Sequence, residues 1–273
     1  MHEHDQGLVL DLPTLLSRRR MLGLLGIAGA AAVAGCSAET AETSAGDAPP
    51  GPGQPPGQTQ TQTADGEIPE ETAGPFPGDG SNGVNVLTES GIVRSDLTRS
   101  FGTTSAVATG VPLTIALTVL DVAGSGTGQP LAGAAVYLWH CDQQGRYSLY
   151  SQGVEQENYL RGVQVADAAG KVTFTSIYPA AYDGRWPHIH FEVYATLEKA
   201  TTASDKLRTS QLALPEDAST AVYATGGYEQ SVRNMANTSL DSDMVFSDGY
   251  SLQLGTVSGD VSSGLTVTLS IPV

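Results

Sequence analysis

Two histidines, His188 and His190, stand one residue apart in a mostly apolar segment, residues 187–193. The segment predicts a β-strand, along which side chains alternate between the two faces. Both imidazoles then share one face, where together they could bind a metal ion, while Ile189 and Phe191 point into a core. Two histidines on a solvent-exposed face would give the same pattern. The pair alone therefore leaves both interpretations open.

Two tyrosines extend this set of possible ligands. Tyr147 follows the end of a predicted strand, and Tyr182 precedes the histidines by a turn. The pKa of a free phenol is about 10, so tyrosine binds a metal as phenolate only where a strong Lewis acid displaces its proton. Zinc sites use His, Cys and carboxylates, and copper suits His, Cys and Met. Two Tyr and two His therefore predict one Fe(III) per chain, with a copper or zinc protein that uses only the histidines as the alternative.

Three blocks of sequence, residues 135–147, 160–164 and 177–191, closely resemble the intradiol ring-cleavage dioxygenases in order, spacing and residue types. The resemblance begins near Thr72–Phe76 and continues through Gln211–Leu212, so it spans most of the chain after residue 66. It implies the fold of that family, an antiparallel β-sandwich with long active-site loops.

The resemblance also implies a set of site residues, at Tyr147, Tyr182, His188, His190, Arg185 and Gln211. The first four are implied to bind the iron. Arg185 matches an arginine beside the substrate ring, and Gln211 matches a glutamine that pairs with that arginine. Tyr182 has a second implied role, because one tyrosinate leaves the metal when substrate binds and can take up a proton. The family spacing to His188 selects Tyr182 over Tyr178.

Five other residues in the matching blocks receive no catalytic role. Trp139 occupies a position that tends to lie near the pocket, but a core aromatic residue fits the pattern equally well. Arg146 and Arg161 are treated as structural or exposed. His140 and Cys141 are adjacent, so along a strand they face opposite sides and cannot easily bind one ion together.

The implied activity is the opening of a catechol-type ring by O2 between its two hydroxylated carbons, which gives a muconate-type dicarboxylate. The substrate could be catechol, protocatechuate, a hydroxyquinol or a larger aromatic diol. The alternative is an exported binding module without enzymatic activity, for an aromatic or carbohydrate ligand, because β-sandwiches carry many functions.

The first 36 residues predict export. Residues 17–22 resemble a twin-arginine signal, and the apolar run that follows is shorter than the about 20 residues that span a bilayer. Residues 33–36 resemble a bacterial lipobox, which predicts lipidation of Cys36 and anchoring to the outer face of the cytoplasmic membrane. A plain secretory signal with an incidental cysteine is the alternative. With Cys36 lipidated, Cys141 has no disulfide partner within the chain.

The rest of the sequence predicts a tether and one domain. The chain has 273 residues and a net charge of −16, which does not favour a nucleic-acid partner. Residues 37–66 are rich in Pro, Gly, Gln and Thr and predict a flexible tether, and residues 67–273 form the catalytic domain. Strands are expected within residues 111–122, 135–141, 171–177 and 265–271, with no convincing amphipathic helix between them. This pattern predicts an all-β, antiparallel β-sandwich.

Overall fold

A computed structural model describes residues 66–123 and 128–273, so the predicted signal, Cys36 and nearly all of the tether lie outside the described residues. The strands are β1 (Pro112–Asp121), β2 (Gln129–Pro130), β3 (Ala135–Trp139), β4 (Arg161–Val165), β5 (Lys171–Ile177), β6 (His188–Tyr194), β7 (Lys206–Ala213), β8 (Thr256–Asp260) and β9 (Gly264–Pro272). The helices are α2 (Leu197–Thr201), α3 (Glu216–Tyr223) and α4 (Glu229–Met235). Among these described helices, none is long and apolar enough to cross a membrane.

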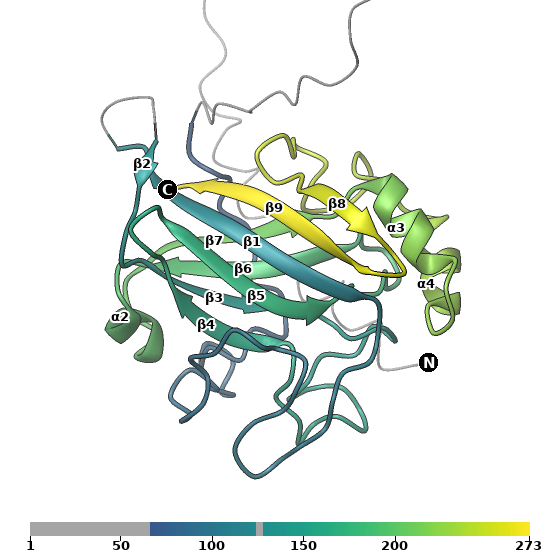
Figure 1. Cartoon of the computed structure of the whole chain (residues 1–273), viewed down its shortest axis with the longest axis horizontal. Coiled ribbons are helices and arrows are strands. Elements are labelled where there is room, and N and C mark those ends of the chain that lie inside the picture. The colour runs from purple at the N-terminus through teal and green to yellow at the C-terminus, as the bar shows by residue number, and fades with distance from the viewer. Residues whose placement is uncertain (1–65, 124–127) are drawn as a thin grey trace, which may run out of the picture.

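The strands form two stacked sheets (Figure 1). One sheet has the order β2-β1-β9-β8 with β5 paired to β1, and the other has the order β4-β3-β6-β7. The predicted all-β sandwich is confirmed. It differs from a purely antiparallel arrangement because β1 and β9 run parallel. Alternation along a strand predicts which face is buried, but not which strand becomes its neighbour or in which direction that neighbour runs.

The main core lies between the two sheets. It takes the apolar side chains that alternate along β1, β5 and β9 from one sheet and those of β3 and β6 from the other. In β6 these are Ile189, Phe191 and Val193, which are at most 1% exposed. Burial of a side chain of this size stabilises the fold by roughly 1.5–3 kcal/mol. The core therefore fixes the register of β6, and with it the opposite face that carries His188 and His190.

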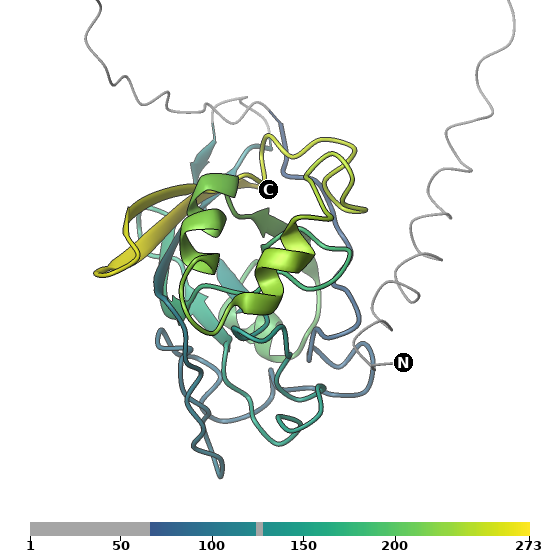
Figure 2. The ribbon, with the colours of Figure 1, turned by 90° about the vertical axis from the view of Figure 1, so that its right-hand side faces the viewer.

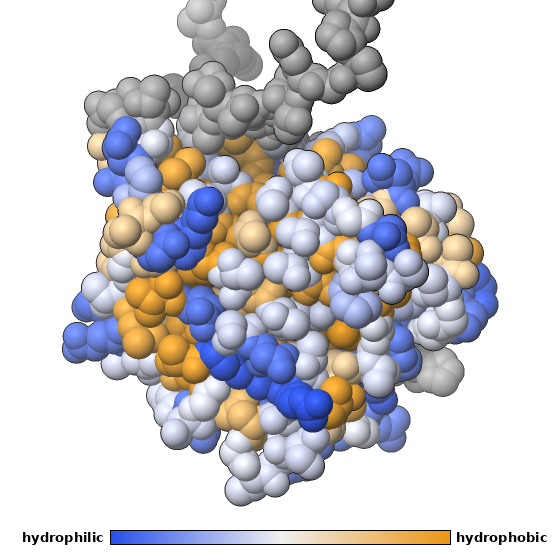
Figure 3. All heavy atoms as spheres, viewed as in Figure 1, coloured by the Kyte–Doolittle hydropathy of each residue, from blue (hydrophilic) through white to orange (hydrophobic). Residues whose placement is uncertain are grey.

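The outer face of the five-stranded sheet is more polar than the inner face that lines the core. Thr and Ser alternate with the buried residues along β1, β5 and β9, and they are partly or fully exposed. The centre of this face accordingly shows residues of intermediate hydropathy (Figure 3). It is a solvated β-surface of the kind that period-two alternation predicts. The two histidines lie on the other sheet, on its side away from the shared core.

The expectation that no helix interrupts the strands was wrong. Helices α3 and α4 lie together at one end of the sandwich (Figure 2). They span only eight and seven residues and bury three and two side chains respectively, so the helical periodicity is too brief to stand out in the sequence. The start of α3 does carry a signal, because Pro215 precedes it and two acidic residues occupy its first turn.

Candidate metal centre

Four residues form a row across the four-stranded sheet, on its face away from the main core. Trp139 on β3 lies opposite Arg161 on β4 and opposite His190 on β6. His190 in turn lies opposite Gln211 on β7. Side chains of residues directly opposite each other in a sheet share one face. The register therefore places Gln211 beside His190, although 21 residues of sequence separate the two.

His188 and His190 point to the same face of β6, as the alternation predicts. They are 2% and 3% exposed, which excludes a pair on a solvent-exposed face. Their Nε2 atoms lie 3.1 Å apart. His188 Nδ1 donates a hydrogen bond of 2.5 Å to the carbonyl oxygen of Trp186. Since Nδ1 of the neutral ring carries the hydrogen, Nε2 of His188 directs a lone pair at its neighbours.

The two tyrosines reach this pair of imidazoles from loops. Tyr182 Oη lies 3.1 Å from His188 Nε2, and Tyr147 Oη lies 3.5 Å from Tyr182 Oη. The rings of Tyr147 and His190 also meet edge to face, with centroids 6.1 Å apart. Two phenolic oxygens and two imidazole nitrogens thus converge on one place. We call Tyr147, Tyr182, His188 and His190 the tetrad.

A buried aspartate shapes the loop that leads to Tyr147. Asp142 Oδ1 accepts hydrogen bonds from the backbone N–H groups of Gln144 and Arg146. Arg146 also pairs with Asp142 Oδ2 through its guanidinium group, which gives Arg146 a structural role in this turn. Gly145 has φ +81°, a left-handed conformation that costs glycine little. The turn therefore sets the direction in which the chain enters Tyr147.

Helix α4 supports the loop that carries Tyr182. The Ala181 N–H donates to Ser231 Oγ at 3.1 Å, and Asn234 Nδ2 donates to the Ala181 carbonyl oxygen at 2.9 Å. Both partners lie on α4, so a helix that the sequence did not predict holds the residue before Tyr182. Tyr178 belongs to the main core and contacts Ser219 Oγ at 2.8 Å. The structure thus brings Tyr182, and not Tyr178, to the histidines.

The tetrad has the electrostatics of a site that needs a cation. Burial raises the pKa of the Tyr147 phenol well above its usual value. Burial lowers the pKa of His188 and His190, with added repulsion of a proton by Arg185 at His188 and by His188 at His190. The histidines are therefore neutral, and Tyr147 ionises only beside a strong positive charge. With two hard oxygen donors and two imidazoles, the tetrad fits a ferric ion.

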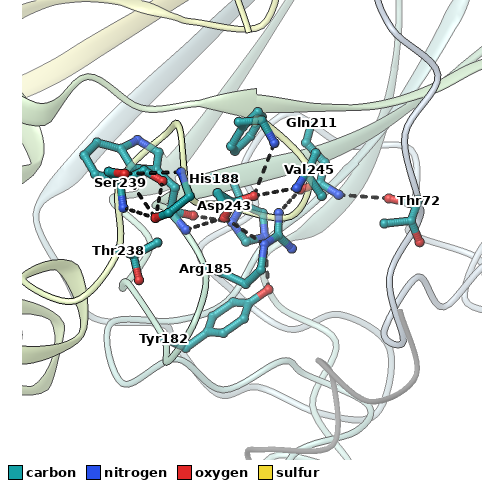
Figure 4. Close-up of polar contacts among 12 residues, drawn as sticks. Thr72, Tyr182, Arg185, His188, Gln211, Thr238, Ser239, Asp243 and Val245 are labelled. Atoms are coloured by element: carbon teal, nitrogen blue, oxygen red, sulfur yellow. Dashed lines mark hydrogen bonds and ion pairs between the residues drawn. The ribbon is translucent and has the colours of Figure 1, made fainter. Parts of the chain in front are cut away.

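Arg185 lies beside the tetrad and is 3% exposed. Its Nε donates to Asp243 Oδ2 at 3.0 Å and its Nη2 donates to Gln211 Oε1 at 2.6 Å. Figure 4 shows the Tyr182 hydroxyl directed at this guanidinium group. Burial lowers the pKa of Arg185, but the nearby Tyr182 and Asp243 outweigh burial and raise it above the usual value. The side chain is therefore a fixed positive charge next to the proposed ligands.

Comparisons with known proteins agree with this geometry. A family model described as "Dioxygenase" matches residues 88–219. The chain is 35% identical over 57 residues to a chlorocatechol 1,2-dioxygenase of Rhodococcus opacus, and 38% identical over 55 residues to a catechol 1,2-dioxygenase 2 of Acinetobacter lwoffii. These stretches cover 21% and 20% of this chain. The match over residues 88–219 and these two relatives support the intradiol ring-cleavage dioxygenase family for this chain.

The fold agrees over a longer stretch than the sequence does. An intradiol ring-cleavage dioxygenase from Tetranychus urticae superposes with a TM-score of 0.54 at 24% identity, over 67% of this chain and 87% of that chain. The matched stretches span only about a fifth of the length of the two curated relatives, 22% and 20%.

Two further parts of the domain pack against the tetrad. Trp139 is fully buried, and its ring stacks on His190 with centroids 5.0 Å apart and an interplanar angle of 8°. Gly74, at φ +70°, lies so close that a Cβ there would be 3.4 Å from His190 Cε1. Phe76 packs against Tyr147 with ring centroids 5.0 Å apart. Trp139 therefore supports a proposed ligand directly, and residues 72–76 run along the site.

Asp243 is the site residue that the sequence did not indicate. It lies 58 residues after Arg185, in a loop outside the family match, and no local motif marks it. Asp183, a carboxylate only two residues before Arg185, is exposed. His140 offers no second metal site, because its ring nitrogens contact the Cys141 carbonyl oxygen and Ser176 Oγ. Within the described part of the chain, no three or more His, Cys, Asp or Glu side chains lie together so that they could hold a metal ion.

Proposed function

We propose that this family member is a non-haem Fe(III) enzyme that uses O2 to open the ring of a catechol-type diol. The observation that carries this proposal is the convergence of the tetrad beside a buried, cationic Arg185. The names of two relatives, a chlorocatechol and a catechol 1,2-dioxygenase, support the substrate class. In the proposed reaction the bond between the two hydroxylated carbons breaks, and both atoms of O2 enter the product, a muconate-type dicarboxylate.

The tetrad would hold one iron per chain through Tyr147, Tyr182, His188 and His190. A bound ferric ion would supply the Lewis acidity that ionises the phenols and the diol, and the redox activity that O2 requires. Tyr182 is more exposed than Tyr147, so it is the phenol better placed to hold a proton from the diol at its Oη atom. Arg185 would stabilise negative charge as it develops on the ring, as fixed cations and dipoles do in many active sites. Gln211 would hold Arg185 in place.

The test begins with the purified protein. We expect about one ferric iron per chain and a red to brown colour from phenolate-to-iron charge transfer, because two phenolates are proposed as ligands. Turnover of a panel of catechol, protocatechuate and hydroxyquinol, with identification of the ring-opened product, then tests the reaction and ranks the substrates. The Tyr147→Phe variant should weaken or shift the visible band.

The outcomes separate the alternatives. A colourless, zinc-loaded protein with full activity would exclude the ferric proposal. A protein that binds the aromatic diols but never opens their rings would instead favour a binding module. Tyr178→Phe is a matched control, because Tyr178 lies in the main core, and it should leave the visible band in place.

We also propose that the domain is exported and held at the outer face of the cytoplasmic membrane by a lipid on Cys36. The arginine pair, the short apolar run and the cysteine follow one another in the order of a lipoprotein signal. Cys36→Ser should move the protein from the membrane fraction to the soluble fraction without a change in activity. Unchanged membrane association of that variant would contradict the anchor.

A further inference from the structure

The loop between α4 and β8 contributes a fully buried carboxylate, Asp243, that is 0% exposed. Its Oδ2 accepts hydrogen bonds from Arg185 Nε at 3.0 Å and from the Trp186 N–H at 2.6 Å. Its Oδ1 accepts from the N–H groups of Val245 at 2.8 Å and Phe246 at 3.3 Å. One side chain thus ties its own loop to the two residues that lead into the strand of the histidines.

Every one of these four neighbours is a donor. A carboxylate suits such a place, because both oxygens accept and neither carries a hydrogen. A carboxamide of the same shape would turn its NH2 group toward N–H donors on one side or the other. The position therefore calls for the chemistry of aspartate, and asparagine fits its shape but not its hydrogen bonds. Losing one partner of a buried charged pair also leaves the other charge uncompensated.

Two sets of hydrogen bonds connect Asp243 to the site. The first is direct, because its bond to Nε fixes one edge of the Arg185 guanidinium group while Gln211 fixes another. Gln211 in turn donates from Nε2 to the Thr72 carbonyl oxygen at 2.9 Å, so the arginine is held from both sides (Figure 4). The second set runs through Trp186, whose N–H binds Asp243 and whose carbonyl oxygen accepts from His188 Nδ1.

We propose that Asp243 is a positioning residue, which orients the Arg185 side chain and, through the backbone of Trp186, the ring of His188. The loop after α4 then helps to position residues of the site, although it lies outside the segment that matches the family. This inference rests on the proposed ring-opening function for its kinetic consequence, but the positions of Arg185 and His188 can be measured without any turnover.

The experiment compares Asp243→Asn with the wild type and with Asp248→Asn. Asp248 lies in the same loop and is exposed, so its variant controls for the loss of one negative charge there. Iron content should stay near the wild-type value in both variants, because Asp243 is not a proposed ligand. We expect kcat of Asp243→Asn to fall about 10- to 100-fold with a smaller change in KM, since a displaced group near the chemistry costs up to about that much. Asp248→Asn should keep the wild-type kcat.

A double-mutant cycle with Arg185→Leu distinguishes positioning from general stability. If Asp243 acts through Arg185, Asp243→Asn should cost little further rate once Arg185 is gone. Equal losses in both backgrounds would overturn the proposal. Where Asp243→Asn does not accumulate as folded protein, Asp243→Glu replaces it, because the longer side chain keeps the charge and misplaces the bond to Nε. A wild-type kcat in that variant would also overturn the proposal.

Crystal structures of the wild type and of the variant provide the readout that does not depend on activity. We expect the Arg185 guanidinium group to leave its wild-type position, and the bond from His188 Nδ1 to Trp186 to lengthen. An unmoved guanidinium group would overturn the proposal even for a protein that turns over no diol. An inactive wild type whose Arg185 moves in the variant would instead contradict the proposed function and leave the positioning role intact.

Discussion

Two buried arginines flank the tetrad, and the protein binds them in opposite ways. Arg161 is 1% exposed and donates five hydrogen bonds, to the carbonyl oxygens of Phe76, Pro77 and Ser148 and to the hydroxyls of Tyr137 and Ser148. All its partners are neutral oxygens. Arg185 is bound by a carboxylate and an amide oxygen, and its Nη1 group takes part in neither of these bonds.

The difference separates a structural arginine, Arg161, from an arginine whose charge acts on the proposed site, Arg185. A guanidinium group has five N–H donors, and Arg161 uses all five in hydrogen bonds to the protein. Four of these bonds connect two loops. One of those loops contains Phe76, which packs on Tyr147, and the other contains Ser148, which follows Tyr147. Arg185 makes fewer hydrogen bonds to the protein, and its positive charge interacts with Tyr182 and Tyr147. Two buried arginines in one site are thus distinguished by what accepts their hydrogen bonds.

The largest effect is expected from Arg161→Leu. The substitution leaves five acceptors without their donor, four in the two loops and one on β3, at roughly 1 kcal/mol or more for each bond. We expect the free energy of unfolding in urea to fall by about 5 kcal/mol, which is a large part of the about 5–15 kcal/mol of a typical domain.

Arg146→Leu is the matched control for that variant. Arg146 also pairs within the site loops, but its side chain is 35% exposed, so its loss should cost less than about 1 kcal/mol. If Arg161→Leu is no less stable than Arg146→Leu, Arg161 does not hold the two loops together.

A smaller effect, on rate instead of stability, is expected from Arg185→Leu. The variant should retain iron and colour, because Arg185 is not a proposed ligand. Its ring-opening rate should fall about 10²–10³-fold, as is common when a preorganised charge is removed, which corresponds to about 2.7–4 kcal/mol in the barrier. Steady-state kinetics and iron content, measured on the same preparation with a catechol that the wild type cleaves, check both statements.

Arg233→Leu serves as the control for charge. Arg233 is an exposed residue of α4, and its loss should change neither iron content nor rate. Near-normal turnover of Arg185→Leu with normal iron would remove Arg185 from the mechanism and make both buried arginines structural.

The sequence predicted those parts of the site that depend on a short repeat or a family motif. The alternation in β6 predicted the faces of His188 and Ile189 correctly, because a core between two sheets selects one register. The motif spacing pointed to Tyr182, and the structure places its hydroxyl beside His188. That these residues bind iron stays a prediction. The position of Gln211 beside His190 became clear only from the pairing of β6 with β7.

The parts that the sequence did not predict depend on contacts between distant segments. Asp243 has no motif, and only the folded loop brings it to Arg185. The role of α4 has the same origin, because Ser231 and Asn234 reach the Ala181 backbone from a helix too short to be recognised by periodicity. The parallel pairing of β1 with β9 likewise follows from the topology of the whole sheet and not from either strand alone.

The parallel pairing of β1 with β9 affects when the domain can complete its folding. Ile115 of β1 pairs with Val267 of β9, and the Ile68 N–H donates to the Pro272 carbonyl oxygen, so the five-stranded sheet joins segments from both ends of the domain. Contacts between such distant residues form slowly, because a long loop must close before they are gained. During synthesis β1 emerges from the ribosome long before its parallel neighbour. One edge of β1 therefore stays unpaired until β9 is made, and the sheet is completed only after nearly the whole domain has been translated.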